Sequence, residues 1–193
     1  MLFSKRAALT AGSIVTAAAS VIAAAAVSHA SDRPATEAGT VARSHATPVA
    51  PQLRVPDGNK RIAELAAKGV QTYACTNDAW TFVEPAATLS DVRDRHHRPV
   101  ALHSRGPVWV STVDGSAVNA AAVPGASNPR AGAVPELLLK ATADRGQGLF
   151  GSVSYIQRLN TRGGVAPTGP CEAGAQTGVP YTATYVFYEP TVR

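Results

Sequence analysis

The chain has 193 residues, of which 45% are hydrophobic and 16% are charged, and its formal net charge at pH 7 is +5. The Lys and Arg residues form no long basic run, so the sequence favours neither a nucleic-acid-binding protein nor one that binds anionic membranes. The length suits one domain with one hydrophobic core, once terminal segments are set aside.

Residues 1–30 have the features of a secretory signal peptide. Lys5 and Arg6 precede a long apolar run rich in alanine, and residues 28–30 (Ser-His-Ala) have the small-x-small pattern of a cleavage site. A retained membrane anchor is the alternative, but the Thr, Ser and Gly residues in the run make it a weak membrane span. We therefore expect cleavage after Ala30, a secreted, extracellular protein without a membrane span, and a net charge of +3 once Lys5 and Arg6 are lost.

Residues 31–52 are rich in Ala, Thr, Ser and Pro and show no apolar periodicity. Such a segment buries too little apolar surface to offset its chain entropy, so we predict a disordered linker.

Residues 53–193 then form a single domain with two cysteines, Cys75 and Cys171. In a secreted chain, two cysteines predict one disulfide bond, and two free buried thiols are the alternative.

The first part of the domain is predicted to contain a helix and two strands. Residues 59–68 place Ile62 and Leu65 at helical spacing, and Gly69 stands where a helix cap belongs. Residues 69–75 alternate as a strand does, and residues 80–83 form a second strand that Pro85 is expected to end. Residues 86–99 are irregular and polar.

The second part is predicted to be all strands and turns. Strands are expected at residues 100–104, 108–113, 116–123, 137–143, 149–159 and 179–188. Asp114-Gly115 predicts a hairpin turn, residues 124–135 a loop, residues 144–148 a turn, and Gly163-Gly164 a turn after the 149–159 strand. About eight short strands with one or two short helices are typical of a mainly β, antiparallel sandwich or barrel-like domain.

Ordered motifs along this domain resemble those of DUF3455, a bacterial and fungal family. The motifs are GVQTYAC at residues 69–75, Trp80, His103, Gly106-Pro107, Trp109, Asp114-Gly115-Ser116, Tyr155-Ile156-Gln157-Arg158, Asn160-Thr161, Gly163-Gly164, Ala166-Pro167, Cys171, Pro180-Tyr181, Tyr185 and Tyr188. The resemblance spans residues 55–188 and implies a secreted domain of unassigned activity, with no catalytic residues to carry over. Some relatives carry a malate dehydrogenase label. This chain has no glycine-rich dinucleotide fingerprint, so we expect neither that activity nor a cofactor.

Two kinds of catalytic chemistry find weak support. Asp91, Asp94, His96, His97 and His103 include donors for a metal ion, but their spacing matches no metal motif, so a solvated polar loop is the preferred interpretation. Adjacent histidines on a strand also point to opposite faces.

The chain lacks a Gly-x-Ser-x-Gly nucleophile turn. A secreted hydrolase with His103 as general base is the alternative function, and it needs a serine or an acid brought to His103 by folding.

A binding module is the preferred function. Aromatic side chains beside planar hydrogen-bonding groups suit a polar small molecule or a glycan, although core packing is the alternative for each aromatic. The candidate ligand-binding residues are Arg158, Asn160, Gln157, His103, Trp109 and Trp80. Arg158 stands on the mixed face of the 149–159 strand and Asn160 stands where that strand leaves the sheet, so we predict that both contact the ligand. An ion pair of Arg158 with Asp114 or Glu189 is the structural alternative. No oligomeric state follows from the sequence.

Overall fold

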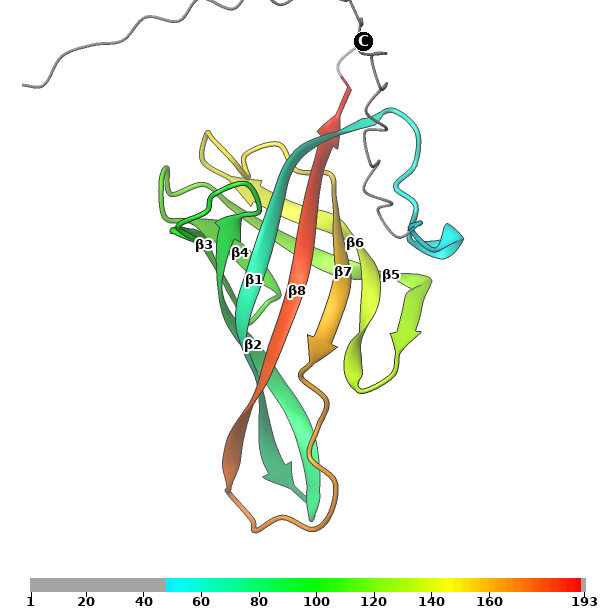
Figure 1. The fold of residues 1–193 in the computed structure, drawn as a ribbon, viewed down its shortest axis with the longest axis vertical. Helices are drawn as coiled ribbons and strands as arrows, with labels where there is room; N and C mark the ends of the chain where they lie inside the picture. Colours follow the sequence, from blue (N-terminus) through cyan, green and yellow to red (C-terminus); the bar gives the residue numbers. More distant parts are fainter. Residues whose placement is uncertain (1–47, 192–193) are drawn as a thin grey trace, which may run out of the picture. The chain divides into compact units, whose positions relative to one another are not determined.

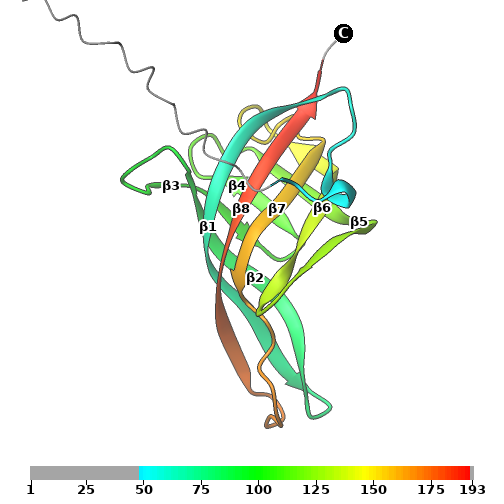
Figure 2. The same cartoon turned by 45° about the vertical axis from the view of Figure 1, so that its right-hand side comes forward.

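The computed structural model describes residues 48–191, so the predicted signal peptide and residues 31–47 of the predicted linker lie outside the described residues. Within this range, eight antiparallel strands pair in sequence order, and the last pairs with the first to close a barrel (Figures 1 and 2). The elements are η1 (Pro51–Leu53), β1 (Asn59–Thr76), β2 (Ala79–Asp91), β3 (Pro99–Ser104), β4 (Val108–Ser111), β5 (Ala117–Arg130), β6 (Ala133–Arg145), β7 (Tyr155–Gly163) and β8 (Gln176–Pro190). The predicted mainly β single domain is confirmed, in its barrel form.

The helix predicted at residues 59–68 is wrong, because this segment is the first half of β1. Its apolar residues fit both a helical and an alternating period, and hydrogen bonding to β8 and β2 on its two sides decides for the strand. Leu65 and Ala67 are buried inside the barrel. Gly69 does not cap a helix; it lies within β1, where a Cβ atom would overlap the backbone of Ala86 in β2.

Two predicted strand ends are also wrong. β2 does not end at Pro85 but continues to Asp91. Pro85 is tolerated because the pairing of β2 with β3 begins only at Ala87, so no neighbouring strand on that side needs its missing N–H group. The predicted loop at residues 124–135 contains the ends of β5 and β6, which form a hairpin that turns at Gly132, where φ is +66°.

One end of the barrel is closed by residues 149–154, here called the cap segment. These residues form turns and do not begin the long strand that alternation predicts, because their backbone is bonded elsewhere. Oδ2 of Asp114 accepts a hydrogen bond from the Leu149 N–H at 2.9 Å, and Oγ of Ser116 accepts one from the Phe150 N–H at 3.0 Å. Ser116 also donates to Asp114 at 2.6 Å, so the β4–β5 turn holds the cap segment in place.

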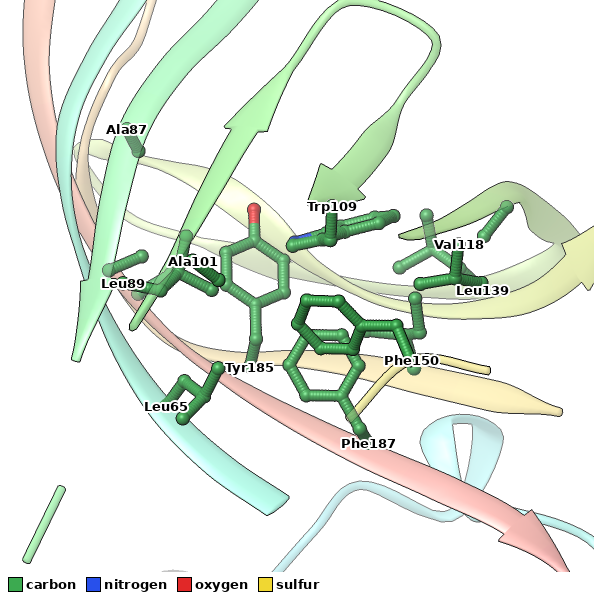
Figure 3. Close-up of a cluster of buried hydrophobic side chains, with 14 of the residues drawn as sticks. Leu65, Ala87, Leu89, Ala101, Trp109, Val118, Leu139, Phe150, Tyr185 and Phe187 are labelled. Carbon is green, nitrogen blue, oxygen red and sulfur yellow. The ribbon is translucent and has the colours of Figure 1, made fainter. Parts of the chain in front are cut away.

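Aromatic side chains fill the barrel beneath the cap segment. Phe150 is fully buried and packs against Phe187, with 4.7 Å between the ring centroids (Figure 3). Trp109 and Tyr185 lie next to this pair and are also buried, so the aromatic cluster occupies the middle of the barrel. The cluster and the cap segment together fill this end of the barrel.

At the other end, β1, β2 and β8 extend beyond the remaining strands (Figure 1). Cys75 lies near the tip of the β1–β2 hairpin and is bonded to Cys171 in the connection between β7 and β8, with 5.7 Å between the Cα atoms. The predicted disulfide is therefore confirmed. It ties that connection to the hairpin and so fixes one side of the open end.

Residues 48–53, at the end of the predicted linker, lie against the outside of the barrel. Leu53 is fully buried and packs with Ala126 and Leu138, and Val49 and Ala50 border this cluster. None of the helical segments among residues 48–191 has the length and apolar character that crossing a bilayer requires.

Candidate functional site

A cavity of about 550 Å³ occupies the open end of the barrel. All eight strands contribute to its lining, and the wall is mainly apolar. The apolar wall residues include Phe82, Val83, Pro85, Ala122, Val134, Leu137 and Leu139. This volume lies within the range of about 300–1,000 Å³ that is typical of small-molecule sites, so the cavity is the leading candidate for the functional site of this domain.

The floor of the cavity is aromatic. His103 on β3 and Trp109 on β4 are cross-strand neighbours, and their rings stack with 4.2 Å between centroids and 6° between planes. Tyr185 on β8 meets both rings edge-on, at 5.2 Å and 5.3 Å. Figure 3 shows the Tyr185 ring beside Trp109, with its hydroxyl pointing away from Phe187. These stacked and edge-on contacts fix each ring, so the floor is rigid before any ligand arrives.

His103 is held neutral at physiological pH. Its side chain is 3% exposed, and this burial lowers its pKa from 6.5 to about 4. The hydrogen bond between Nδ1 and the carbonyl oxygen of Val108, at 2.9 Å, acts in the opposite direction, and the charge of Arg158 adds to the lowering. Because a carbonyl oxygen only accepts, Nδ1 carries the proton of the neutral ring and Nε2 keeps its lone pair.

Arg158 projects from β7 into the cavity. Its Nε and Nη2 groups donate to the carbonyl oxygen of Pro135, at 3.1 Å and 2.8 Å. The alternative ion pair with Asp114 or Glu189 is not formed: Asp114 accepts from the cap segment and its anchoring serine, and Glu189 pairs with Lys60 at 3.0 Å. Arg158 is therefore positioned by a backbone carbonyl rather than by a carboxylate.

The structure brings three of the six predicted ligand-binding residues together. His103, Trp109 and Arg158 all line the cavity. Gln157 does not, because it is next to Arg158 on β7 and alternation turns it outward, where its Nε2 donates to the Leu53 carbonyl at 2.6 Å. Trp80 lies beside Cys75 on the β1–β2 hairpin, outside the cavity lining.

Asn160 is also separated from Arg158. It has a φ of +52° and stands at a shift in the β7–β8 register, which turns it to the outside of the barrel. Its backbone N–H donates to Oε1 of Glu136 at 2.8 Å, and its side chain lies 3.4 Å from the Thr184 hydroxyl. The left-handed backbone and these contacts give Asn160 a role in shaping the bulge.

Gln71 is one of the cavity residues that the candidate list of the sequence analysis did not include, and it is a buried polar one. It is 2% exposed and lies on the inward face of β1, two residues before Tyr73. Its signal in the sequence is a polar side chain on the same alternating face as Tyr73 and Cys75. Tyr73 itself donates to the Gly164 carbonyl at 2.6 Å, which joins the cavity rim to the disulfide-bearing connection.

The polar residues 91–98 form ion pairs near the opposite end of β2. Arg93 donates to Asp91 at 2.7 Å and Arg98 to Asp94 at 2.9 Å, and these hydrogen bonds lower the pKa of each carboxyl to about 2. His103 is not among them, since it points into the barrel. Across the described part of the chain, no group of three or more His, Cys, Asp or Glu residues has a geometry that could hold a metal ion.

Comparison with known proteins gives a family but no activity. The model of the family described as "Protein of unknown function (DUF3455)" matches residues 56–189, which is most of the chain. No curated protein and no solved structure matches the chain significantly. The ordered motifs and this match agree, and the chain belongs to the DUF3455 family.

Proposed function

We propose that this domain is a binding module that takes up a small molecule with an apolar body through the open end of the barrel. The observation that carries the proposal is a mainly apolar cavity of about 550 Å³ in a barrel whose other end is closed by the cap segment. A rigid wall with a few inward polar groups is the usual composition of such sites. The disulfide at the rim supports this function, because it keeps the entrance in one shape.

The same geometry favours a molecule with an apolar body over a glycan. Sugar recognition commonly uses an aromatic face that is free to stack on the ring. Trp109 has one face against His103, and its edges meet Tyr185 and Phe187, so it is 1% exposed. The cavity wall around it is largely aliphatic, which suits hydrocarbon.

The hydrolase alternative is not supported by the surroundings of His103. A general base needs a pKa near the working pH and a hydroxyl or water within reach. The pKa of His103 is lowered to about 4 by burial, and its one hydrogen bond in the described residues is to the Val108 carbonyl. Neither a serine nor an acid bonds to it in that part of the chain.

Export of the protein is part of the proposal. The Cys75–Cys171 disulfide supports it, because such bonds persist in oxidising compartments. N-terminal sequencing of protein recovered from the medium should give Ser31 as the first residue. Recovery of chains that still begin at Met1 would contradict cleavage and favour an anchor.

The binding proposal is tested with N-phenylnaphthylamine, a neutral probe whose fluorescence rises in apolar sites. The wild-type protein should bind it saturably. Ala122→Trp places a large side chain in the cavity mouth and should abolish the signal, since Ala122 lines the cavity. Ala121→Trp is the matched control, because Ala121 is exposed on the outer face of the same strand and pairs with Lys140. Equal probe binding by the two variants would place the probe elsewhere and contradict the proposal.

A further inference from the structure

The cavity contains a cation that has no counter-ion. Arg158 lines it, and no Asp or Glu among residues 48–191 forms an ion pair with its guanidinium. Arg105 also lines the cavity, but it stands at the rim and pairs with Glu84 at 3.2 Å. The cavity lining includes no carboxylate. A positive charge facing a mainly apolar space favours an anion that enters that space.

The guanidinium of Arg158 also presents a free edge. Nε and Nη2 share the Pro135 carbonyl, which holds the plane of the group in one orientation. Nη1 donates no hydrogen bond at bonding distance among the described residues, and the Tyr185 hydroxyl lies close to the guanidinium, so Nη1 and the second N–H of Nη2 are available beside that hydroxyl. Two parallel N–H groups along such an edge match the two oxygens of a carboxylate.

Further polar groups of the cavity lack partners. The buried atoms Nε2 of Gln71, Nε1 of Trp109 and Oη of Tyr185 have no partner at hydrogen-bonding distance within residues 48–191, although the Tyr181 hydroxyl lies near Gln71 and Tyr185. The amide and indole nitrogens only donate, and the hydroxyl can donate. Burial raises the pKa of Tyr185, while the nearby charge of Arg158 acts in the opposite direction, so the cation and the hydroxyl belong to one electrostatic site. This cluster of donors requires an acceptor-rich group.

We propose that the cavity binds an organic monocarboxylate with an apolar body, an inference that rests on the proposed binding function. The carboxylate accepts hydrogen bonds from the free edge of Arg158 and from the unpartnered donors beside it. The hydrocarbon lies against Leu137 and Leu139 on β6. One cation with neutral donors balances a single negative charge, whereas a phosphate dianion would leave charge unneutralised in an apolar space.

The test compares octanoate with octanol, which share a hydrocarbon chain and differ in charge. Isothermal titration calorimetry near neutral pH should show octanoate binding the wild-type protein about tenfold or more tightly than octanol. Arg158→Gln should weaken octanoate binding about 10-fold to 100-fold and change octanol binding less than about threefold. Arg145→Gln is the matched control, because it removes an exposed cation outside the cavity lining, and it should leave both affinities within about twofold.

The outcomes separate this inference from the proposed function. Equal affinity of octanoate and octanol for the wild type, or unchanged octanoate binding by a folded Arg158→Gln, overturns the inference that the ligand is a carboxylate. Either result leaves the proposal of cavity binding intact. If the protein binds N-phenylnaphthylamine but not octanoate, the carboxylate inference is also overturned and the binding function stands. If N-phenylnaphthylamine, octanoate and octanol all fail to bind, the proposed binding function is itself overturned. Circular dichroism checks that Arg158→Gln is folded; if it is not, the wild-type comparison of octanoate with octanol decides.

Discussion

Buried His103 should make the barrel less stable in mild acid. Burial lowers the pKa of its imidazole from 6.5 to about 4. In the unfolded chain the ring takes up a proton near pH 6.5, whereas in the folded chain it stays neutral until about pH 4. Between these values the unfolded chain binds more protons, so the free energy of unfolding falls as the pH falls.

The expected loss follows from this difference in pKa. Each pKa unit corresponds to about 1.4 kcal/mol, so the full difference in pKa contributes roughly 3 kcal/mol to the free energy of unfolding. About 2 kcal/mol of this contribution is lost between pH 7 and pH 5. Carboxylates with lowered pKa, such as Asp91, Asp94 and Asp114, stabilise the fold above their unfolded pKa, near 4, and lose that contribution only below it. The interval from pH 7 to pH 5 therefore isolates His103.

The assay is urea unfolding at about pH 7 and pH 5, followed by tryptophan fluorescence. The control variant is His103→Asn, whose amide nitrogen can replace Nδ1 as donor to the Val108 carbonyl but does not titrate. We expect this variant to be less stable at both pH values, because it loses the stacking on Trp109, and to change by less than about 0.5 kcal/mol between them. A loss of about 2 kcal/mol in the variant as well would refute the role assigned to His103.

Three further predictions concern stability. Reduction of the Cys75–Cys171 disulfide, whose cysteines are 96 positions apart, should lower the free energy of unfolding by up to about 4–5 kcal/mol, measured by urea unfolding with and without reductant; an unchanged midpoint would contradict this. Gly69→Ala should cost about 2–3 kcal/mol, because the new Cβ overlaps the backbone of β2, whereas Gly178→Ala meets only a valine side chain and should cost less in the same thermal melts. Ser116→Ala removes the hydroxyl that links the β4–β5 turn to the cap segment and should cost about 2 kcal/mol, with faster amide exchange at Phe150; protected exchange there would count against the link.

The local pattern of the sequence predicts most of the barrel. Alternation at residues 179–188 and the Asp114-Gly115 turn correspond to β8 and the β4–β5 connection, and the strand expected at residues 137–143 lies within β6. These features succeed because alternation and turn chemistry act over a few residues. The helix prediction for residues 59–68 is wrong because the short apolar pattern there fits both a helical and a strand period. The strand forms because the segment pairs with β2 and β8, and a local pattern does not report these partners.

In the candidate site, too, the local sequence pattern predicts some features and distant contacts decide the others. Alternation puts Arg158 on the opposite face from Gln157, but which face is the interior depends on barrel closure. The inward face of β7 carries Arg158, and a register shift near the end of the strand turns Asn160 outward. A bulge adds one residue and reverses the side-chain direction, which no local pattern reports.

The sequence by itself determined the strand-rich fold class, the family and the identity of Cys75 and Cys171 as the two possible partners of a disulfide, because composition, ordered motifs and a count of two cysteines need no knowledge of distant contacts. The tertiary structure alone decided which end of the barrel is closed and which side chains share the cavity. His103, Trp109 and Arg158 come from three strands, and their meeting depends on strand register around a closed sheet. Register is set by hydrogen bonds between segments many residues apart, and shifting it by one residue turns an inward side chain outward.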